Sequence, residues 1–254
     1  MMGKVICLAN QKGGVGKTTS TNALAMCLKH RGYRVLCVDF DPQGNLSFSM
    51  NADAEHSPTI YDVLKRRVKS QFAIHHTDLV DIIPANLLLS SVEVEFTGKG
   101  REFLLKECLR PVIPQYDYIL VDSPPALGVL TVNAFTLADV VLIPVLTDVY
   151  SLQGITRLHD TVSQIKNALN PALQFGGMFL VRYRPREELS RTVRETAELI
   201  SQSLGVPLLK TAIRSSVAVA KAQAMQKDMV KSEPHNHAVQ DYLDLTDELL
   251  EGGL

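Results

Sequence analysis

The stretch N-Q-K-G-G-V-G-K-T-T, residues 10–19, decides the fold of this chain. It follows a short apolar run, KVICLA (4–9), and leads into a helix-length segment, residues 17–30. Glycines let a backbone curl so that several N–H groups face one anion, and the N-terminus of the following helix adds partial positive charge. A strand, a glycine-rich turn and a helix in this order predict a phosphate-binding loop.

The loop departs from the usual G-x-x-x-x-G-K-[ST] pattern. Gln11 stands where the first glycine is expected, and an additional lysine, Lys12, precedes the glycines. Lys17 is expected to reach the β- and γ-phosphates of a nucleotide, and the Thr18 hydroxyl is expected to ligate Mg²⁺. The alternative, a glycine-rich turn without a ligand, is disfavoured by the number of matching residues in the correct strand–helix context.

The composition is that of an ordinary soluble globular protein. Of the 254 residues, 46% are hydrophobic and 21% are charged, and the net charge is −1. This balance gives no overall attraction to nucleic acid or anionic lipid, so such binding requires a local patch. The four cysteines form no C-x-x-C pair, which favours buried, reduced thiols. Because a signal peptide and an apolar run of about 20 residues are both absent, the sequence predicts a cytoplasmic protein.

Short β-rich runs alternate with helix-length segments along the chain, and several runs are nearly continuous in Val, Ile and Leu, as in strands covered on both faces. The predicted strands are 4–9, 34–39, 80–84, 118–122, 140–145, 175–181 and 208–213. The predicted helices are 17–30, 59–67, 101–110, 130–137, 152–169, 187–204, 217–226 and 238–250. Gly32 is expected to end the first helix, and Ser57 with Pro58 to begin the second. Residues 1–254 are expected to form one α/β domain with a mainly parallel, doubly wound sheet.

Carboxylates follow two of the predicted strands. Asp39 and Asp41 come at the end of the strand 34–39, and alternation along a strand places them on the same side. Asp122 ends the apolar strand 118–122. Ligands gather at the C-terminal ends of parallel strands, so these acids are expected to face the phosphates and Mg²⁺. In the alternative, Asp39 and Asp41 only cap the turn that follows them.

Four segments carry a family resemblance: K-G-G-V-G-K-T-T (12–19), V-D-F-D-P-Q-G-N (38–45), V-D-S-P-P-A-L-G (121–128) and L-T-V-N-A (130–134). In this combination the chain resembles the ParA/MinD family of deviant-Walker P-loop ATPases, and within it the short Soj-like partition ATPases. The resemblance covers essentially the whole chain, because residues 143–154 and 242–245 also match family positions.

The resemblance implies a role for the additional lysine. In this family the lysine at the Lys12 position crosses a dimer interface to the phosphates of the partner subunit, so the implied assembly is a homodimer that sandwiches two ATP molecules. By the same resemblance Lys12, Lys17 and Asp41 are catalytic, with Asp41 positioning the attacking water. The implied Mg²⁺ ligands are Thr18, Asp41 and Asp122, and Asp39 supports them. The implied nucleotide-binding residues are Lys12, Gly13, Gly14, Val15, Gly16, Lys17, Thr18, Thr19, Arg214 and Ser216.

Basic residues gather in the C-terminal third, where the family places its DNA contacts. The resemblance therefore predicts non-specific binding of double-stranded DNA by the ATP dimer, with steep salt dependence. The expected contacts are Arg182, Arg184, Arg186, Arg214 and Lys221. Arg214 and Lys221 share one helix face if their helix extends back far enough. In the alternative, these are ordinary solvated side chains. The family role is chromosome or plasmid partition on the nucleoid with a ParB-like adaptor.

The stretch 213–228 departs from the family pattern. Soj-like members usually carry I-P-R-[NS] here, whereas this chain has Arg214 at the proline position and Ser215 at the arginine position. Ser216 stands where the family often has an adenine-contacting asparagine. Lys221 replaces a glutamate. This departure bears on both the adenine contacts and the DNA contacts.

Three other functions require different sequence features. A MinD-like membrane ATPase ends in a basic amphipathic helix, whereas this chain has no Lys or Arg after Lys231 and is acidic from Asp241 to Glu251. An iron–sulfur reductase needs cysteines beyond the strand 118–122, and there are none after Cys108. The sequence therefore predicts no membrane partner and no iron–sulfur cluster. An orphan ATPase that positions another cargo on a protein scaffold remains open.

Overall fold

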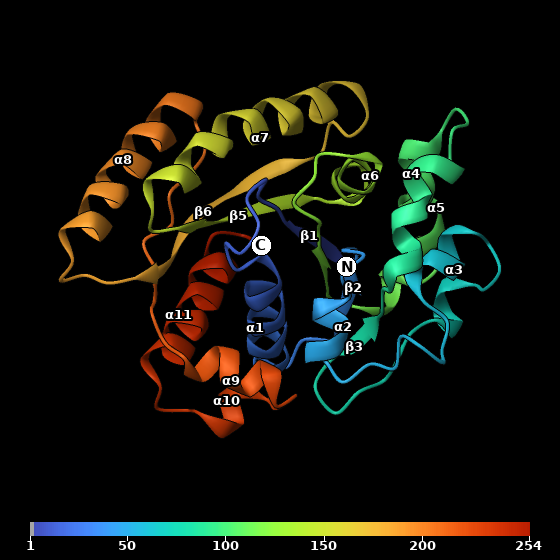
Figure 1. Ribbon diagram of the computed structural model, residues 1–254, viewed down its shortest axis with the longest axis horizontal. Coiled ribbons are helices and arrows are strands. Elements are labelled where there is room, and N and C mark those ends of the chain that lie inside the picture. The colour runs from blue at the N-terminus through green and yellow to red at the C-terminus, as the bar shows by residue number, and fades with distance from the viewer. Residues whose placement is uncertain (1–2) are drawn as a thin grey trace.

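Seven parallel strands form one sheet through the centre of the molecule (Figure 1). The computed structural model describes residues 3–254, except for the side chains of residues 149, 150 and 153. In their order across the sheet the strands are β3 (Asp81–Ile83), β2 (Val35–Asp39), β4 (Tyr118–Asp122), β1 (Lys4–Leu8), β5 (Val140–Leu146), β6 (Gln174–Tyr183) and β7 (Ile213–Arg214). All neighbouring pairs are parallel, so the predicted α/β, doubly wound fold is confirmed.

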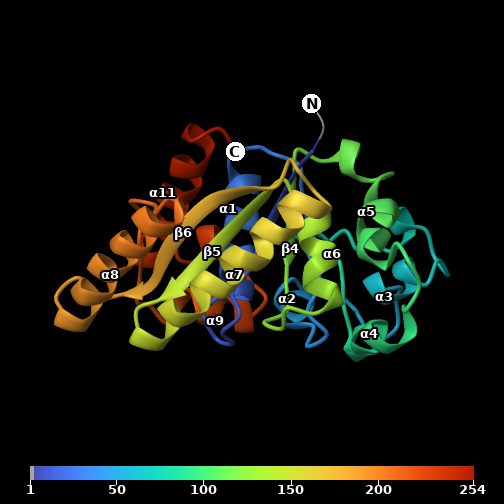
Figure 2. The same cartoon turned by 90° about the horizontal axis from the view of Figure 1, so that it is seen from above.

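Helices cover both faces of the sheet, and each face has its own hydrophobic core (Figures 1 and 2). One face carries α3 (Ile60–Leu64), α4 (Val92–Glu95), α5 (Leu104–Leu109), α6 (Val129–Leu137), α7 (Val149–Ala168) and α8 (Glu188–Leu204). The other face carries α1 (Lys17–His30), α2 (Asn45–Ser49), α9 (Ala218–Ala224), α10 (Met229–Ser232) and α11 (His237–Glu251). None of the helices in the described chain is long and apolar enough to cross a membrane.

Helix α1 lies between the sheet and the C-terminal helices. Its residues from Ser20 to Leu28 are all buried, and the Ser20 hydroxyl lies 2.9 Å from the Tyr242 hydroxyl of α11. Leu243 and Leu250 of α11 pack against the core of this face. Helix α1, which begins at the phosphate loop, is therefore packed between the sheet and the C-terminal helices.

The strand register brings the predicted acids together. Leu8 of β1 pairs with Asp122 of β4, and Asp122 pairs in turn with Asp39 of β2. The C-terminal ends of three neighbouring strands thus meet at one edge of the sheet, where β1 runs into the glycine-rich loop. This is the edge at which ligands bind in open parallel sheets.

The prediction of a strand at 208–213 is wrong for most of that segment. Only Ile213 and Arg214 form β7, and Leu208 makes an isolated bridge with Met178. The backbone amides of Lys210 and Thr211 donate instead to the Glu248 carboxylate, at 2.7 and 2.9 Å. A side chain of α11 therefore replaces the sheet as their hydrogen-bond partner, which local sequence does not reveal.

Two predicted helix starts also differ. The N-cap of α3 is Thr59, which forms a capping box with Asp62, so Ser57 is not the cap. Helix α9 begins at Ala218, and Arg214 lies in β7. Arg214 and Lys221 are therefore not on one helix face. The short helices α2, α4 and α10 were missed, because segments of four or five residues carry too little periodic pattern.

Candidate nucleotide site

The glycine-rich loop connects β1 to α1. Gly14 and Gly16 have φ angles of 73° and 85°, in the left-handed region that residues with a Cβ rarely adopt. Gly16 is also the N-cap of α1, so the loop curls directly into the helix N-terminus. Val15 is fully buried and anchors the loop, whereas Gly13 and Gly14 are exposed. The loop presents backbone N–H groups and a helix terminus to one point in space, as an anion site requires.

Lys17 lies inside this loop. Only 6% of the residue is exposed, and its ammonium donates a long hydrogen bond of 3.4 Å to the carbonyl oxygen of Lys12. Burial lowers the pKa of Lys17, while the nearby carboxylates of Asp122 and Asp41 act in the opposite direction. A cation held in this way gains most from an anionic ligand placed in the loop.

Asp122 is a fully buried acid of the site. Its carboxylate accepts hydrogen bonds from the Thr18 hydroxyl at 2.6 Å and, more weakly, from the Thr21 hydroxyl at 3.5 Å. Burial raises the pKa of Asp122 to about 8, and repulsion from Asp39 adds to the effect. The structure therefore joins the end of β4 to the first turn of α1 through two of the three side chains predicted to ligate Mg²⁺.

Asp39 is also fully buried and serves the neighbouring loop. It accepts hydrogen bonds from the backbone amide and the hydroxyl of Ser47, at 2.8 and 2.7 Å, and from the amide of Asp41 at 3.2 Å. Burial raises its pKa to about 6 despite these bonds. Asp39 thus holds the segment that carries Asp41. These contacts are those expected if Asp39 caps the turn that follows it. Asp39 also pairs with Asp122 in the sheet, so it lies beside the predicted Mg²⁺ ligand.

Asp41 is only half-buried and lines the cavity above the loop. Its carboxylate accepts a hydrogen bond from the amide of Gln43 at 3.0 Å. The second oxygen has no hydrogen bond to the described residues and is available to a ligand or water.

These donors fit a magnesium nucleotide. A hydroxyl and carboxylates are the hard oxygen ligands that Mg²⁺ takes, and Mg²⁺ completes its shell with waters and substrate phosphates. In the part of the chain that the structure describes, no group of three His, Cys, Asp or Glu side chains could hold a metal alone. The raised pKa values of Asp39 and Asp122 indicate a site whose buried negative charge a divalent cation would offset.

Lys12 points away from the phosphate cradle. Its ammonium bonds to both carboxylate oxygens of Asp148, at 2.6 and 2.8 Å, and to the Ser151 hydroxyl at 3.2 Å. Asp148 is at the same time the N-cap of α7, accepting a hydrogen bond from the Ser151 amide at 2.8 Å. The two lysines of the loop therefore have different environments: Lys17 faces the cradle, and Lys12 faces the start of α7.

A cavity of about 480 Å³ opens above the loop. Its walls include residues that sequence reasoning did not connect with the nucleotide: Phe48 of α2, Gln223 of α9 and Arg182 of β6. The amide of Gln223 donates to the carbonyl oxygen of Thr19 at 3.0 Å, which ties α9 to the first turn of α1. No local motif marks these three, because each reaches the cavity from a different element.

Comparison with known proteins identifies the family. A family described as "AAA domain" matches residues 3–175. The Sporulation initiation inhibitor protein Soj of Bacillus subtilis (strain 168) is 37% identical over 256 residues, which cover 99% of this chain and 100% of Soj. The Chromosome partitioning protein ParA of Myxococcus xanthus (strain DK1622) is 34% identical over 253 residues, covering 98% of this chain and 88% of that protein. This chain belongs to the ParA/MinD family of ATPases.

A solved structure supports a magnesium nucleotide as the ligand of this site. Cobyrinic acid a,c-diamide synthase from Mycobacterium smegmatis, crystallised with ADP and magnesium, superposes with a TM-score of 0.87 at 31% identity, covering 98% of this chain and 95% of that one. That structure supports nucleotide and Mg²⁺ binding in this fold. Family membership and the names of the relatives support an ATPase of the ParA partition type.

Two residues that the ParA/MinD resemblance assigns to nucleotide binding, Arg214 and Ser216, lie outside the nucleotide cavity. The Arg214 guanidinium bonds to the buried Asp241 carboxylate of α11, at distances from 2.7 to 3.1 Å, and to the carbonyl oxygen of His237. The Ser216 hydroxyl accepts a hydrogen bond from the Ala218 amide at the start of α9. Neither residue lines the cavity. In this structure the Arg214 guanidinium balances the buried Asp241 carboxylate, and its predicted nucleotide and DNA contacts stay predictions.

Apart from Arg214, the predicted DNA residues divide into three groups. Arg186 and Lys221 are exposed. Arg184 is exposed but paired with Glu187 at 2.8 Å. Arg182 is also exposed, and it lies on the wall of the nucleotide cavity.

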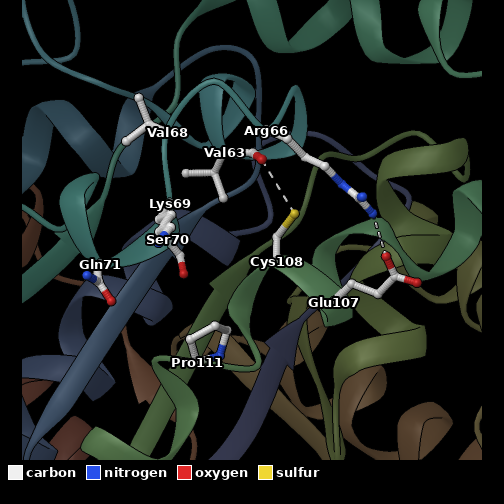
Figure 3. Close-up of a pocket in the computed structure, with 9 residues that line it drawn as sticks. All are labelled: Val63, Arg66, Val68, Lys69, Ser70, Gln71, Glu107, Cys108 and Pro111. Carbon is white, nitrogen blue, oxygen red and sulfur yellow. Dashed lines mark hydrogen bonds and ion pairs between the residues drawn. The ribbon is translucent and has the colours of Figure 1, made fainter.

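A second and larger cavity, of about 590 Å³, lies between α3 and α5 (Figure 3). Its walls include Arg66, Lys69 and Cys108. Arg66 pairs with Glu107 at 2.8 Å, and the Cys108 thiol donates to the carbonyl oxygen of Val63 at 3.4 Å. None of the residues predicted for the ATPase site lines this cavity.

Proposed function

We propose that this protein is a ParA-type partition ATPase that hydrolyses Mg²⁺–ATP slowly as an ATP-sandwich homodimer and binds DNA non-specifically in that state. The observation that carries the proposal is the joining of Asp122 to Thr18 beside the buried Lys17, with the additional Lys12 at the mouth of the same loop. We further infer that residues 1–254 act as one ATPase domain.

Each side chain then has a separate task. The loop amides and Lys17 bind the β- and γ-phosphates, replacing the weak contact between the Lys17 ammonium and the Lys12 carbonyl. Thr18 and Asp122 hold Mg²⁺, which supplies charge neutralisation for phosphoryl transfer. Asp41, half-buried at the cavity wall, orients the attacking water. Asp39 keeps the Asp41 segment in place through Ser47.

Lys12 couples hydrolysis to assembly. In a single subunit its ammonium is bonded to Asp148 and lies outside the cradle that Lys17 occupies. For Lys12 to stabilise charge on a nucleotide of the partner subunit, it has to leave Asp148. A second cation that arrives only in the dimer makes the isolated subunit a poor catalyst, since such cations supply much of the rate in other NTPases. Slow, dimer-dependent hydrolysis follows.

The DNA surface is proposed on Arg186 and Lys221, supported by Arg184. Exposed guanidinium and ammonium groups track phosphates without reading sequence, and a dimer doubles their number. With a net charge of −1, the attraction is local and falls steeply as salt increases. A ParB-like adaptor as partner and association with the nucleoid in the cytoplasm complete the proposal.

The test is binding to random-sequence duplex DNA at low salt, with ATP, with ADP and without nucleotide. Binding only with ATP, which is lost as salt rises and absent in Lys12→Ala, supports the proposal. If the wild-type protein hydrolyses ATP but never binds DNA, the partition proposal is wrong. The remaining candidate is then an ATPase that positions a cargo along a protein scaffold.

A further inference from the structure

Arg182 occupies an irregular position near the end of β6. The pairing of β6 with β7 shifts register between Val181 and Tyr183, so Arg182 is the extra residue of a bulge. Its φ angle is 54°, in the left-handed region that is unfavourable for a side chain with a Cβ. Its carbonyl oxygen accepts a hydrogen bond from the Thr147 hydroxyl at 3.1 Å. Such strain is typically retained where it directs a side chain to a functional position.

The bulge directs Arg182 toward the nucleotide cavity. Arg182 lines that cavity together with Gly16 and Gln223. The preceding residue, Val181, touches the loop itself: its methyl carbon Cγ2 lies 3.8 Å from the position that a Cβ on Gly16 would take. Backbone contacts therefore hold position 182 next to the phosphate loop, and the exposed Arg182 side chain borders the cavity.

The Arg182 guanidinium differs from its neighbours in its partners. Arg184 pairs with Glu187, and Arg194 pairs with Glu198. Within the described part of the chain, the Arg182 guanidinium forms no ion pair and no hydrogen bond, although the cavity that it borders is also lined by the Asp41 carboxylate. A ligand in the cavity would meet it without first breaking a contact.

The strand order shows which end of a nucleotide Arg182 would meet. The acids that hold Mg²⁺ lie at the ends of β2 and β4, on one side of the loop that follows β1. Arg182 lies on β6, across β1 and β5 on the other side. A nucleotide with its terminal phosphate and metal toward β4 therefore extends its nucleoside toward β6.

We propose that Arg182 is a nucleoside-binding residue of the ATP site and that its planar guanidinium stacks on the purine base. This inference rests on the proposed ATPase function and names a contact within the same site. Guanidinium groups stack readily on aromatic planes and are weakly hydrated, so an Arg at the rim of a cavity suits a base better than an ammonium would. The contact also compensates for Arg214, which Asp241 holds outside the cavity.

The test measures calorimetric binding of ATP, ADP and tripolyphosphate, each with Mg²⁺, to the full chain. In Arg182→Ala and Arg182→Gly we expect affinity for ATP and ADP to fall roughly tenfold, and affinity for tripolyphosphate to stay unchanged, because tripolyphosphate has no base. Glycine accepts the left-handed backbone, so Arg182→Gly should melt at or above the wild-type temperature while binding ATP weakly. Arg110→Ala, an exposed arginine at the end of α5, is the control and should bind all three ligands as the wild type does.

Three results would overturn the inference. Unchanged ATP affinity in both Arg182 variants would show that Arg182 does not contact the nucleotide. An equal loss of tripolyphosphate binding makes Arg182 a phosphate ligand. Unchanged nucleotide affinity with weaker binding to duplex DNA returns Arg182 to the DNA surface that the sequence predicts. The partition proposal fails separately: a wild-type protein that binds ATP through Arg182 but never binds DNA refutes partition and leaves this contact standing.

Discussion

Two cavities of this protein, the nucleotide cavity and the cavity between α3 and α5, differ in charge more than in size. The cavity between α3 and α5, about 590 Å³, is larger than the nucleotide cavity of about 480 Å³, and each has a lysine at its wall. At the larger cavity the main charges, Arg66 and Glu107, are 70% and 59% exposed and already paired. Beneath the smaller one lie Asp122, fully buried, and Lys17, with only 6% of its surface exposed. Buried charge that a ligand would balance, and not volume, distinguishes the functional site.

The strongest way to test this comparison is to remove one lysine from each cavity. Lys17→Ala should lower affinity for Mg²⁺–ATP by roughly a hundredfold or more, because it removes charge-assisted hydrogen bonds from a buried anion site. Lys69→Ala, at the larger cavity, should leave affinity unchanged. Calorimetric titration measures both. Tight ATP binding by Lys17→Ala would show that the phosphates bind elsewhere.

Asp41→Ala separates binding from chemistry within the smaller cavity. The variant should bind ATP, accumulate as a dimer and hydrolyse roughly 10²- to 10⁴-fold more slowly, since the group that orients water is lost. Phosphate release and size-exclusion chromatography with ATP measure the two effects. Asp78→Ala, an exposed acid, is the matched control. Hydrolysis at the wild-type rate in Asp41→Ala would assign the water to another residue.

The buried carboxylates predict a pH dependence that the exposed pair at the larger cavity lacks. Burial raises the pKa of Asp122 to about 8 from an ordinary value of about 4, so the folded protein retains a proton that the unfolded chain loses. Stability from this group is complete below pH 4 and is lost as pH rises toward 8, by up to about 1.4 kcal/mol per pH unit.

Denaturant unfolding of the nucleotide-free protein between pH 5 and 8 measures this slope. Asp122→Asn, which keeps an oxygen for the Thr18 hydroxyl, should flatten the pH dependence and raise stability at pH 8. The same variant should bind Mg²⁺–ATP weakly. An identical slope in the wild type and the variant would contradict the assignment of the shift to Asp122.

The smallest effect is expected at Cys108 in the larger cavity. Burial raises the pKa of the Cys108 thiol, so iodoacetamide should react with it more slowly than with a free cysteine at pH 7. The other three cysteines are buried and should react still less. Saturating Mg²⁺–ATP should not change the rate at Cys108, and Cys108→Ser should hydrolyse ATP normally. A rate that changes with ATP would show that the two cavities are coupled.

Much of the fold and of the phosphate site follows from local sequence. The loop 10–19 contains its glycines, its lysines and its helix start within ten consecutive residues, and α1 was predicted with both of its ends correct, because its signals are local. The continuous Val, Ile and Leu runs likewise predicted parallel strands buried on both faces. The acids Asp39 and Asp122 could be placed because parallel strands end at one edge of a sheet.

Contacts between distant segments were decided only by the tertiary structure. Thr18 meets Asp122 across 104 positions of the chain, and Lys12 meets Asp148 across 136. The Glu248 carboxylate accepts hydrogen bonds from the backbone amides that would otherwise extend β7. The Asp241 carboxylate pairs with Arg214, and a bulge in β6 places Arg182 at the nucleotide cavity. Periodicity and turn chemistry report the preferences of neighbouring residues. The partner of a charged side chain depends on which elements pack beside it, and that is settled when the sheet and its two helical layers assemble.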